Sequence, residues 1–130
     1  MAIKSVMDMV KAAKAEIEQV SVEDAQARMD DDDFLLVDIR DIRELNRDGR
    51  VPGAFHAPRG MLEFWVSPDS PYHKDFFAQE GKKYVFFCAA AARSSLAVKT
   101  LQDMGLENAA EMTGGFKAWK DSGAPVETKD

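Results

Sequence analysis

One thiol, one guanidinium and one hydroxyl lie close together in the segment Cys88-Ala-Ala-Ala-Ala-Arg93-Ser94, and Cys88 is the only cysteine of the chain. A thiol attacks as its thiolate, and a free thiol of pKa about 8.5 is only a few per cent ionised at pH 7. Cys88 follows the apolar run 84–87, which is typical of a buried strand, and a helix is expected from Arg93. The unpaired N–H groups and dipole at that helix start, with the Arg93 charge, would favour an anion. The spacing therefore predicts an activated thiolate in an anion cradle.

The alternative for an isolated cysteine is a small buried side chain with no chemistry. Its position favours reactivity, because ligands of open α/β sheets bind beyond the carboxyl ends of the strands. We therefore predict that Cys88 and Arg93 are catalytic. The other loop residues, which we expect to bind the substrate, are Ala89, Ala90, Ala91, Ala92 and Ser94.

The remaining apolar runs and turn signals supply the elements that must position this loop. Strands are expected at 34–37, 54–57, 84–87 and 109–112, and helices at 22–29, 40–46, 72–79, 93–104 and 116–121. Strands that alternate with helices imply a parallel sheet covered on both faces. Residues 1–20 have apolar side chains at helical spacing and predict an amphipathic helix that packs on the domain, with a partner-binding helix as the alternative.

Composition limits the class of protein. The 130 residues suit one domain, and a net charge of −6 argues against nucleic-acid binding. No apolar run approaches the roughly 20 residues of a membrane span. One cysteine and two histidines exclude a disulfide framework and a multi-thiolate metal site. We expect no metal, no cofactor and no membrane association, and a reducing, cytoplasmic location.

Several segments resemble the rhodanese family of sulfurtransferases. The Cys88 loop resembles the family's active-site pattern C-x-x-G-x-R-S, and the order and spacing of the other motifs hold from about residue 20 to 126. Those motifs are Leu36-Val-Asp-Ile-Arg40, Gly49-Arg-Val-Pro-Gly-Ala54, Gly114-Gly-Phe-Lys-Ala-Trp119 and Pro125-Val126. The resemblance implies a three-layer α/β fold with a central, mostly parallel sheet of about five strands and helices on both faces. It implies one domain over 1–130, with a rhodanese core at 21–126 after the N-terminal helix.

The resemblance also implies a reaction. A thiosulfate sulfurtransferase moves sulfane sulfur from thiosulfate, or a similar small anionic donor, to cyanide or a thiol through a persulfide on Cys88. A sulfur-relay or protein-binding module with a protein acceptor and little thiosulfate activity is the alternative. Phosphatases and arsenate reductases of this fold have a loop one residue longer, and the six residues from Cys88 to Arg93 disfavour both.

The loop 58–65 borders the active site in similar single-domain rhodaneses, so Arg59, Glu63 and Trp65 are expected to bind substrate. Arg59 would hold the sulfonate end of thiosulfate and Trp65 would form a wall. A solvated arginine and a core tryptophan are the alternatives.

Other polar residues and one departure from the family pattern complete the expectations. Asp38, Arg43 and Glu44 are expected to orient loops by hydrogen bonds, and His56 to be a packing residue. Ala91 stands where the family usually has glycine. If that position needs a left-handed backbone, alanine costs about 1–2 kcal/mol there.

Overall fold

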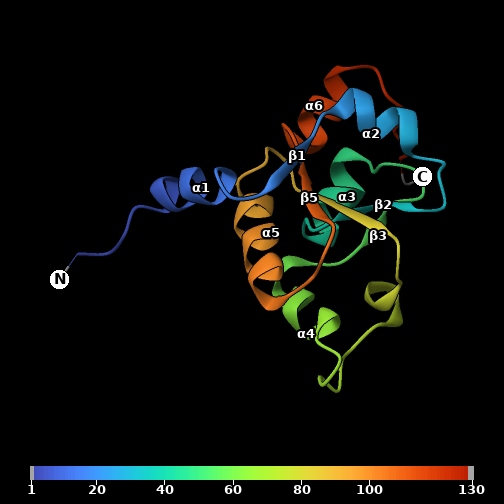
Figure 1. The fold of residues 1–130 in the computed structure, drawn as a ribbon. Helices are drawn as coiled ribbons and strands as arrows, with labels where there is room; N and C mark the ends of the chain where they lie inside the picture. The colour runs from blue at the N-terminus through green and yellow to red at the C-terminus, as the bar shows by residue number, and fades with distance from the viewer. Residues whose placement is uncertain (1, 129–130) are drawn as a thin grey trace.

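The computed structural model describes residues 2–128, which fold around one five-stranded sheet (Figure 1). All four strand pairings are parallel, and the strand order is β1-β5-β4-β2-β3. The predicted α/β fold with a parallel sheet of about five strands is therefore confirmed. The strands are β1 (Glu18–Val20), β2 (Phe34–Asp38), β3 (Phe55–His56), β4 (Lys83–Phe87) and β5 (Ala109–Met112).

Helices cover both faces of this sheet (Figure 1). On one face lie α2 (Val22–Arg28) and α6 (Gly115–Asp121), and on the other lie α4 (Leu62–Val66) and α5 (Arg93–Met104), with α1 (Val6–Lys14) beside α5. Helix α3 (Ile42–Asp48) follows β2, and two 3₁₀ turns, Arg59–Met61 and Asp75–Ala78, complete the fold. The second turn is all that forms of the helix predicted at 72–79. No helix within residues 2–128 is long and apolar enough to cross a membrane.

Strand β4 lies at the centre of the sheet and contributes to the core on both faces. Val85 and Phe87 belong to the apolar cluster under α2 and α6, whereas Tyr84 and Phe86 belong to the cluster under α5. Successive side chains of a strand point to opposite faces, and a parallel sheet is covered on both, so the continuous apolar run fits this position. Packing on both faces holds β4 in place and so sets the position of Cys88 at its carboxyl end.

The N-terminal helix is shorter than predicted. Helix α1 ends at Lys14, and residues Glu18–Val20 form the edge strand β1, paired with β5. Ile17, just before the strand, packs against one core cluster, and Val20 belongs to the other. The helix therefore ends before residue 15, and the prediction of one helix over 1–20 is wrong in extent.

The order in which strands are added to the sheet reverses between the neighbouring strands β2 and β4. Strand β2 connects to β3 on one side, and β4 connects to β5 on the other, while Asp38 and Phe87 pair at the carboxyl ends. Such a switch point leaves a crevice beyond the strand ends, where α/β proteins bind their ligands. Cys88 is the first residue after β4, so it lies at this crevice.

Candidate active site

Cys88 lies beneath its own loop, at the start of helix α5. The residue is 1% exposed, and its Sγ is 3.4 Å from both the backbone N and the Oγ of Ser94. Ala90, at the top of the loop, is exposed, whereas Ala91 is buried. The loop thus surrounds the sulfur with backbone groups, and its role as an anion cradle stays a prediction.

The surroundings of Cys88 favour its charged form. Burial acts to raise the pKa of the thiol, but hydrogen bonds from the Ser94 hydroxyl and from the N–H groups of Ser94, Ala90 and Ala92 outweigh it. The pKa of Cys88 is therefore lower than its ordinary value of 9.0. A larger fraction of Cys88 is thiolate at neutral pH than of a free cysteine, and the thiolate is the nucleophile.

The start of α6 fixes the back of the loop. The N–H of Phe116 donates to the Cys88 carbonyl at 2.8 Å, and the N–H of Lys117 donates to the Ala89 carbonyl at 3.0 Å. This contact requires Gly115, which has φ 64° and whose added Cβ would lie 2.5 Å from the Cys88 oxygen. Because both carbonyls point to α6, they are kept away from the sulfur. The glycine motif that sequence comparison linked to the family therefore shapes the cradle.

Ala91 has the left-handed backbone that its position in the loop suggested. Its φ is 65°, a conformation in which alanine costs about 1–2 kcal/mol. The Ala91 carbonyl accepts a hydrogen bond from Lys14 Nζ at 2.7 Å, and the Ser95 hydroxyl, whose single proton it shares with Glu111, lies 2.9 Å from it. These two contacts hold the strained residue in place.

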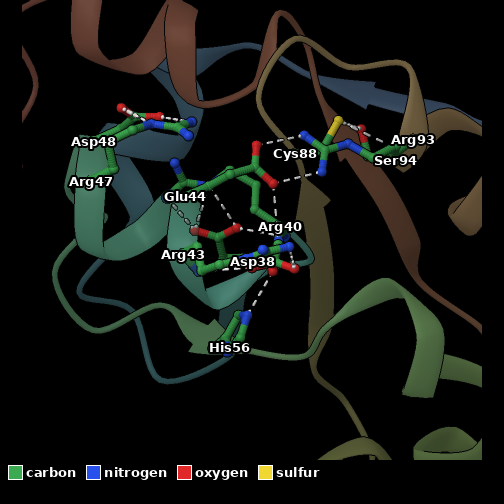
Figure 2. A network of polar contacts seen from close by, with 11 residues as sticks. Asp38, Arg40, Arg43, Glu44, Arg47, Asp48, His56, Cys88, Arg93 and Ser94 are labelled. Atoms are coloured by element: carbon green, nitrogen blue, oxygen red, sulfur yellow. Dashed lines mark hydrogen bonds and ion pairs between the residues drawn. The ribbon is translucent and has the colours of Figure 1, made fainter.

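Arg93 is held by a carboxylate from across the switch point. Figure 2 shows its guanidinium between the Glu44 carboxylate and the Cys88 sulfur. Its Nη1 and Nη2 donate to the two Glu44 oxygens at 2.8 and 3.0 Å. Glu44 raises the pKa of Arg93, and this hydrogen bonding lowers the pKa of Glu44, so both remain charged. The structure therefore gives Glu44 a direct contact with a predicted catalytic residue.

The other polar residues near the end of β2 form a structural group (Figure 2). Asp38 Oδ2 accepts from Arg40 Nη2 at 2.7 Å, both side chains are 1% exposed, and the same nitrogen donates to the Gly49 carbonyl at 2.9 Å. His56 Nε2 lies 2.7 Å from the Arg40 carbonyl oxygen. Arg43 pairs with Asp41 at the surface. These contacts orient the loop between β2 and α3, as expected of Asp38 and Arg43.

A buried carboxylate behind the loop was not predicted. Glu111 of β5 is completely buried, and its Oε2 accepts from Ser94 Oγ at 2.5 Å and from Ser95 Oγ at 2.7 Å. Its Oε1 accepts from Gln19 Nε2 at 2.8 Å and from Lys14 Nζ at 3.0 Å. The sequence held one signal, a glutamate inside a short apolar strand, because buried acids are almost always paired.

The loop 58–65 lies apart from these contacts. Arg59 Nη1 donates to Glu63 Oε1 at 2.6 Å, and no hydrogen bond or ion pair within residues 2–128 joins either side chain to the Cys88 loop. Trp65 is partly buried against the apolar cluster that contains Cys88, with its ring edge-on to Phe55. The substrate-binding role of Arg59, Glu63 and Trp65 stays a prediction.

This arrangement supplies a thiolate, N–H donors and one guanidinium. Within the described part of the chain, no three His, Cys, Asp or Glu side chains are grouped to hold a metal. The groups present suit covalent chemistry at sulfur with an anionic partner.

Comparisons with known proteins identify the family. Residues 21–122 match the rhodanese-like domain family. The chain is 25% identical over 104 residues to a mouse protein named thiosulfate sulfurtransferase/rhodanese-like domain-containing protein 3, and the match covers 77% of this chain and 66% of that protein. The chain thus spans just under two thirds of the length of this curated relative.

Two solved structures are similar over almost the whole chain. A Rhodopseudomonas palustris protein of unknown function, described as a possible tyrosine phosphatase, is 47% identical with a TM-score of 0.92, covering 98% of this chain and 97% of that one. The polysulfide-sulfur transferase homodimer of Wolinella succinogenes is 31% identical with a TM-score of 0.70, covering 95% and 87%. The family match extends over most of the chain and includes the Cys88 loop and the glycines that shape it. The chain belongs to the rhodanese-like domain family.

Proposed function

We propose that this protein is a sulfurtransferase that carries sulfur as a persulfide on Cys88. The observation that carries the proposal is the set of hydrogen bonds from the loop N–H groups and Ser94, which lowers the pKa of Cys88 despite its burial. A nucleophile of this kind, in a loop that points N–H donors at it, suits a small anionic sulfur donor.

The proposed reaction has two steps. The Cys88 thiolate attacks the outer sulfur of thiosulfate, a sulfur–sulfur bond forms to Cys88, and sulfite leaves with the electron pair of the bond that breaks. The terminal sulfur of the persulfide keeps a negative charge, which the loop N–H groups and Arg93 would stabilise. Cyanide or a thiol then attacks that sulfur, and the Cys88 thiolate is restored. Arg59, Glu63 and Trp65 would contact the donor from the neighbouring loop.

A sulfur-relay protein is the second candidate. Cys88 is 1% exposed, so a donor must reach it through the loop, and the similar Wolinella succinogenes protein is named for polysulfide. The relay would take sulfur from polysulfide and deliver it to a protein thiol. Either reaction needs Cys88 reduced, so we place the protein in a reducing, cytoplasmic compartment.

A phosphatase is disfavoured, although the similar Rhodopseudomonas palustris protein is described as a possible tyrosine phosphatase. The loop from Cys88 to Arg93 has six residues. The corresponding loop of related phosphatases is one residue longer and fits a tetrahedral oxyanion.

The test is thiocyanate formation from cyanide with thiosulfate or polysulfide, for the native protein and Cys88→Ser. Hydrolysis of p-nitrophenyl phosphate is measured beside it. We expect turnover that depends on Cys88 and no phosphate hydrolysis, and turnover with polysulfide alone would identify the relay. Phosphate hydrolysis without sulfur transfer would contradict the proposal.

A further inference from the structure

The buried carboxylate of Glu111 lies directly behind the sulfur loop, and the reaction proposed above makes no use of it. Four side chains from three elements donate to it, namely Lys14 of α1, Gln19 of β1, and Ser94 and Ser95 of α5. A fully buried carboxylate is strongly destabilising unless it is paired and hydrogen-bonded. Four donors, one of them charged, therefore stabilise a carboxylate at this position behind Cys88.

The Ser94 hydroxyl connects Glu111 to Cys88. Its Oγ is 2.5 Å from Glu111 Oε2 and 3.4 Å from Cys88 Sγ. A serine has one hydroxyl proton, and an ionised carboxylate only accepts. The sulfur and Glu111 share that one proton, and the shorter, charge-assisted contact draws it toward Glu111 and weakens its hydrogen bond to the sulfur. Glu111 therefore competes with the thiolate for the one hydroxyl beside it.

Lys14 connects the same carboxylate to the strained part of the loop. Its Nζ donates to Glu111 Oε1 at 3.0 Å and to the Ala91 carbonyl at 2.7 Å. Its side chain is 40% exposed, so the ammonium enters the site from the surface side of α1. One cation thus balances the buried charge and holds the left-handed residue of the loop.

We propose that Lys14 and Glu111 are a positioning pair for Cys88, in which Glu111 directs the Ser94 proton away from the sulfur and Lys14 balances that carboxylate and holds the Ala91 carbonyl. The proposal rests on Cys88 being the nucleophile of the proposed function. It assigns a task to helix α1, which lies outside the residues 21–122 that match the family.

The chemical consequence is a limit on how far the thiolate is stabilised. The intrinsic nucleophilicity of a thiolate falls as its pKa falls, and the best attacking thiol has a pKa near the ambient pH. The loop N–H groups lower the pKa of Cys88. A negative charge on the far side of Ser94 would act in the opposite direction, as the proposed role of Glu111 requires. The other charged groups around the site are Arg93 with Glu44, and Arg40 with Asp38.

The test measures the rate of Cys88 alkylation by iodoacetamide against pH, which needs no sulfur transfer. In Glu111→Gln the competing charge is lost, so we expect the midpoint of the curve of alkylation rate against pH, which reports the pKa of Cys88, to fall by about one pH unit. The plateau rate should fall about threefold with it. Lys14→Met removes a positive charge beside the loop while Gln19, Ser94 and Ser95 still donate to Glu111, so we expect the midpoint of the alkylation curve to rise.

Two exposed residues provide matched controls. Lys11→Met removes the same charge from the same helix, and Glu107→Gln makes the same change outside the site. Neither should move the midpoint. An unchanged midpoint in Glu111→Gln would overturn the proposal, as would shifts of the same sign in both site variants, since those would report only a loosened loop. Lys14→Met changes a partly exposed side chain and keeps the test decisive if Glu111→Gln does not fold. Lack of sulfur transfer with opposite shifts would contradict the proposed function and leave the positioning pair intact.

Discussion

Two ion pairs reach the Cys88 loop, and they differ in their exposure to water. Arg93 and Glu44 form the outer pair, with side chains 43% and 19% exposed, whereas the inner pair joins Lys14 to the fully buried Glu111. In the outer pair the cation faces the sulfur, and in the inner pair the carboxylate acts on it through Ser94. Salt should therefore screen the exposed outer pair more than the buried inner pair. The outer pair stabilises the thiolate because its cation is nearer the sulfur, and the inner pair destabilises it because its carboxylate is nearer.

The loop that both pairs reach is held from behind by the contact with the start of α6, and removing that contact should give the largest effect. In Gly115→Ala the new Cβ would lie 2.5 Å from the Cys88 oxygen at a φ of 64°. We expect the free energy of unfolding to fall by about 3 kcal/mol, from left-handed strain and overpacking together. Urea unfolding measures this loss. Gly53→Ala is the control, because Gly53 has φ 79° with no atom within 4 Å of an added Cβ, and it should lose only about 1 kcal/mol. Equal losses in the two variants would argue against the backbone contact.

Removing the outer cation should mainly affect catalysis. Arg93→Met takes away a charge that faces the sulfur, and we expect kcat/KM for thiosulfate to fall about 100-fold. Because the pair is partly exposed, the free energy of unfolding should change by less than about 1 kcal/mol. Arg43→Met is the matched control, since Arg43 pairs with Asp41 at the surface, and its kinetics should match the native protein. A small kinetic loss in Arg93→Met would mean that the outer pair is only structural.

Removing the carboxylate of the outer pair should change thiosulfate kinetics less than removing its cation does, and in the opposite direction. Glu44→Gln frees the Arg93 charge for the donor, so we expect KM for thiosulfate to fall about threefold at low salt. The difference should disappear near 1 M salt, where the Debye length is about 3 Å. The midpoint shift of Glu111→Gln should persist there, and a salt-sensitive shift would contradict the comparison of the two pairs.

The pH range of the outer pair follows from the shift of Glu44. Hydrogen bonding to Arg93 lowers the pKa of Glu44 from 4.5, so the pair contributes above that value and is lost as pH falls through the lowered pKa. At neutral pH the pair is complete, and Glu44→Gln should then differ from the native protein most clearly.

The smallest effect should come from the loop backbone itself. Ala91→Gly relieves a positive φ but removes a buried methyl group, so we expect the free energy of unfolding to rise by at most about 1 kcal/mol. Ala92→Gly is the matched comparison, because its φ of −109° needs no glycine, and it should lose about 0.5–1 kcal/mol. Thermal and urea unfolding would separate the two, and equal changes would argue against strain at Ala91.

The elements around Cys88 were predictable because their signals are local. The helix expected at 93–104 is α5, and the strand expected at 109–112 is β5. The pairing of Glu111 with Lys14 was not, because it joins residues 97 positions apart and depends on the course of residues 15–20. The last three of those residues form the strand β1, where the sequence predicted a continuing helix. Burial of a charged residue is set by tertiary packing, which apolar spacing alone does not reveal.

The most direct test of the central claim is the intact mass of the protein after incubation with thiosulfate alone and removal of the reagent. We expect that the native chain gains one sulfur atom, that Cys88→Ser gains none, and that cyanide or a thiol removes the added mass. A native chain with unchanged mass after thiosulfate and after polysulfide would contradict the claim that Cys88 carries sulfur.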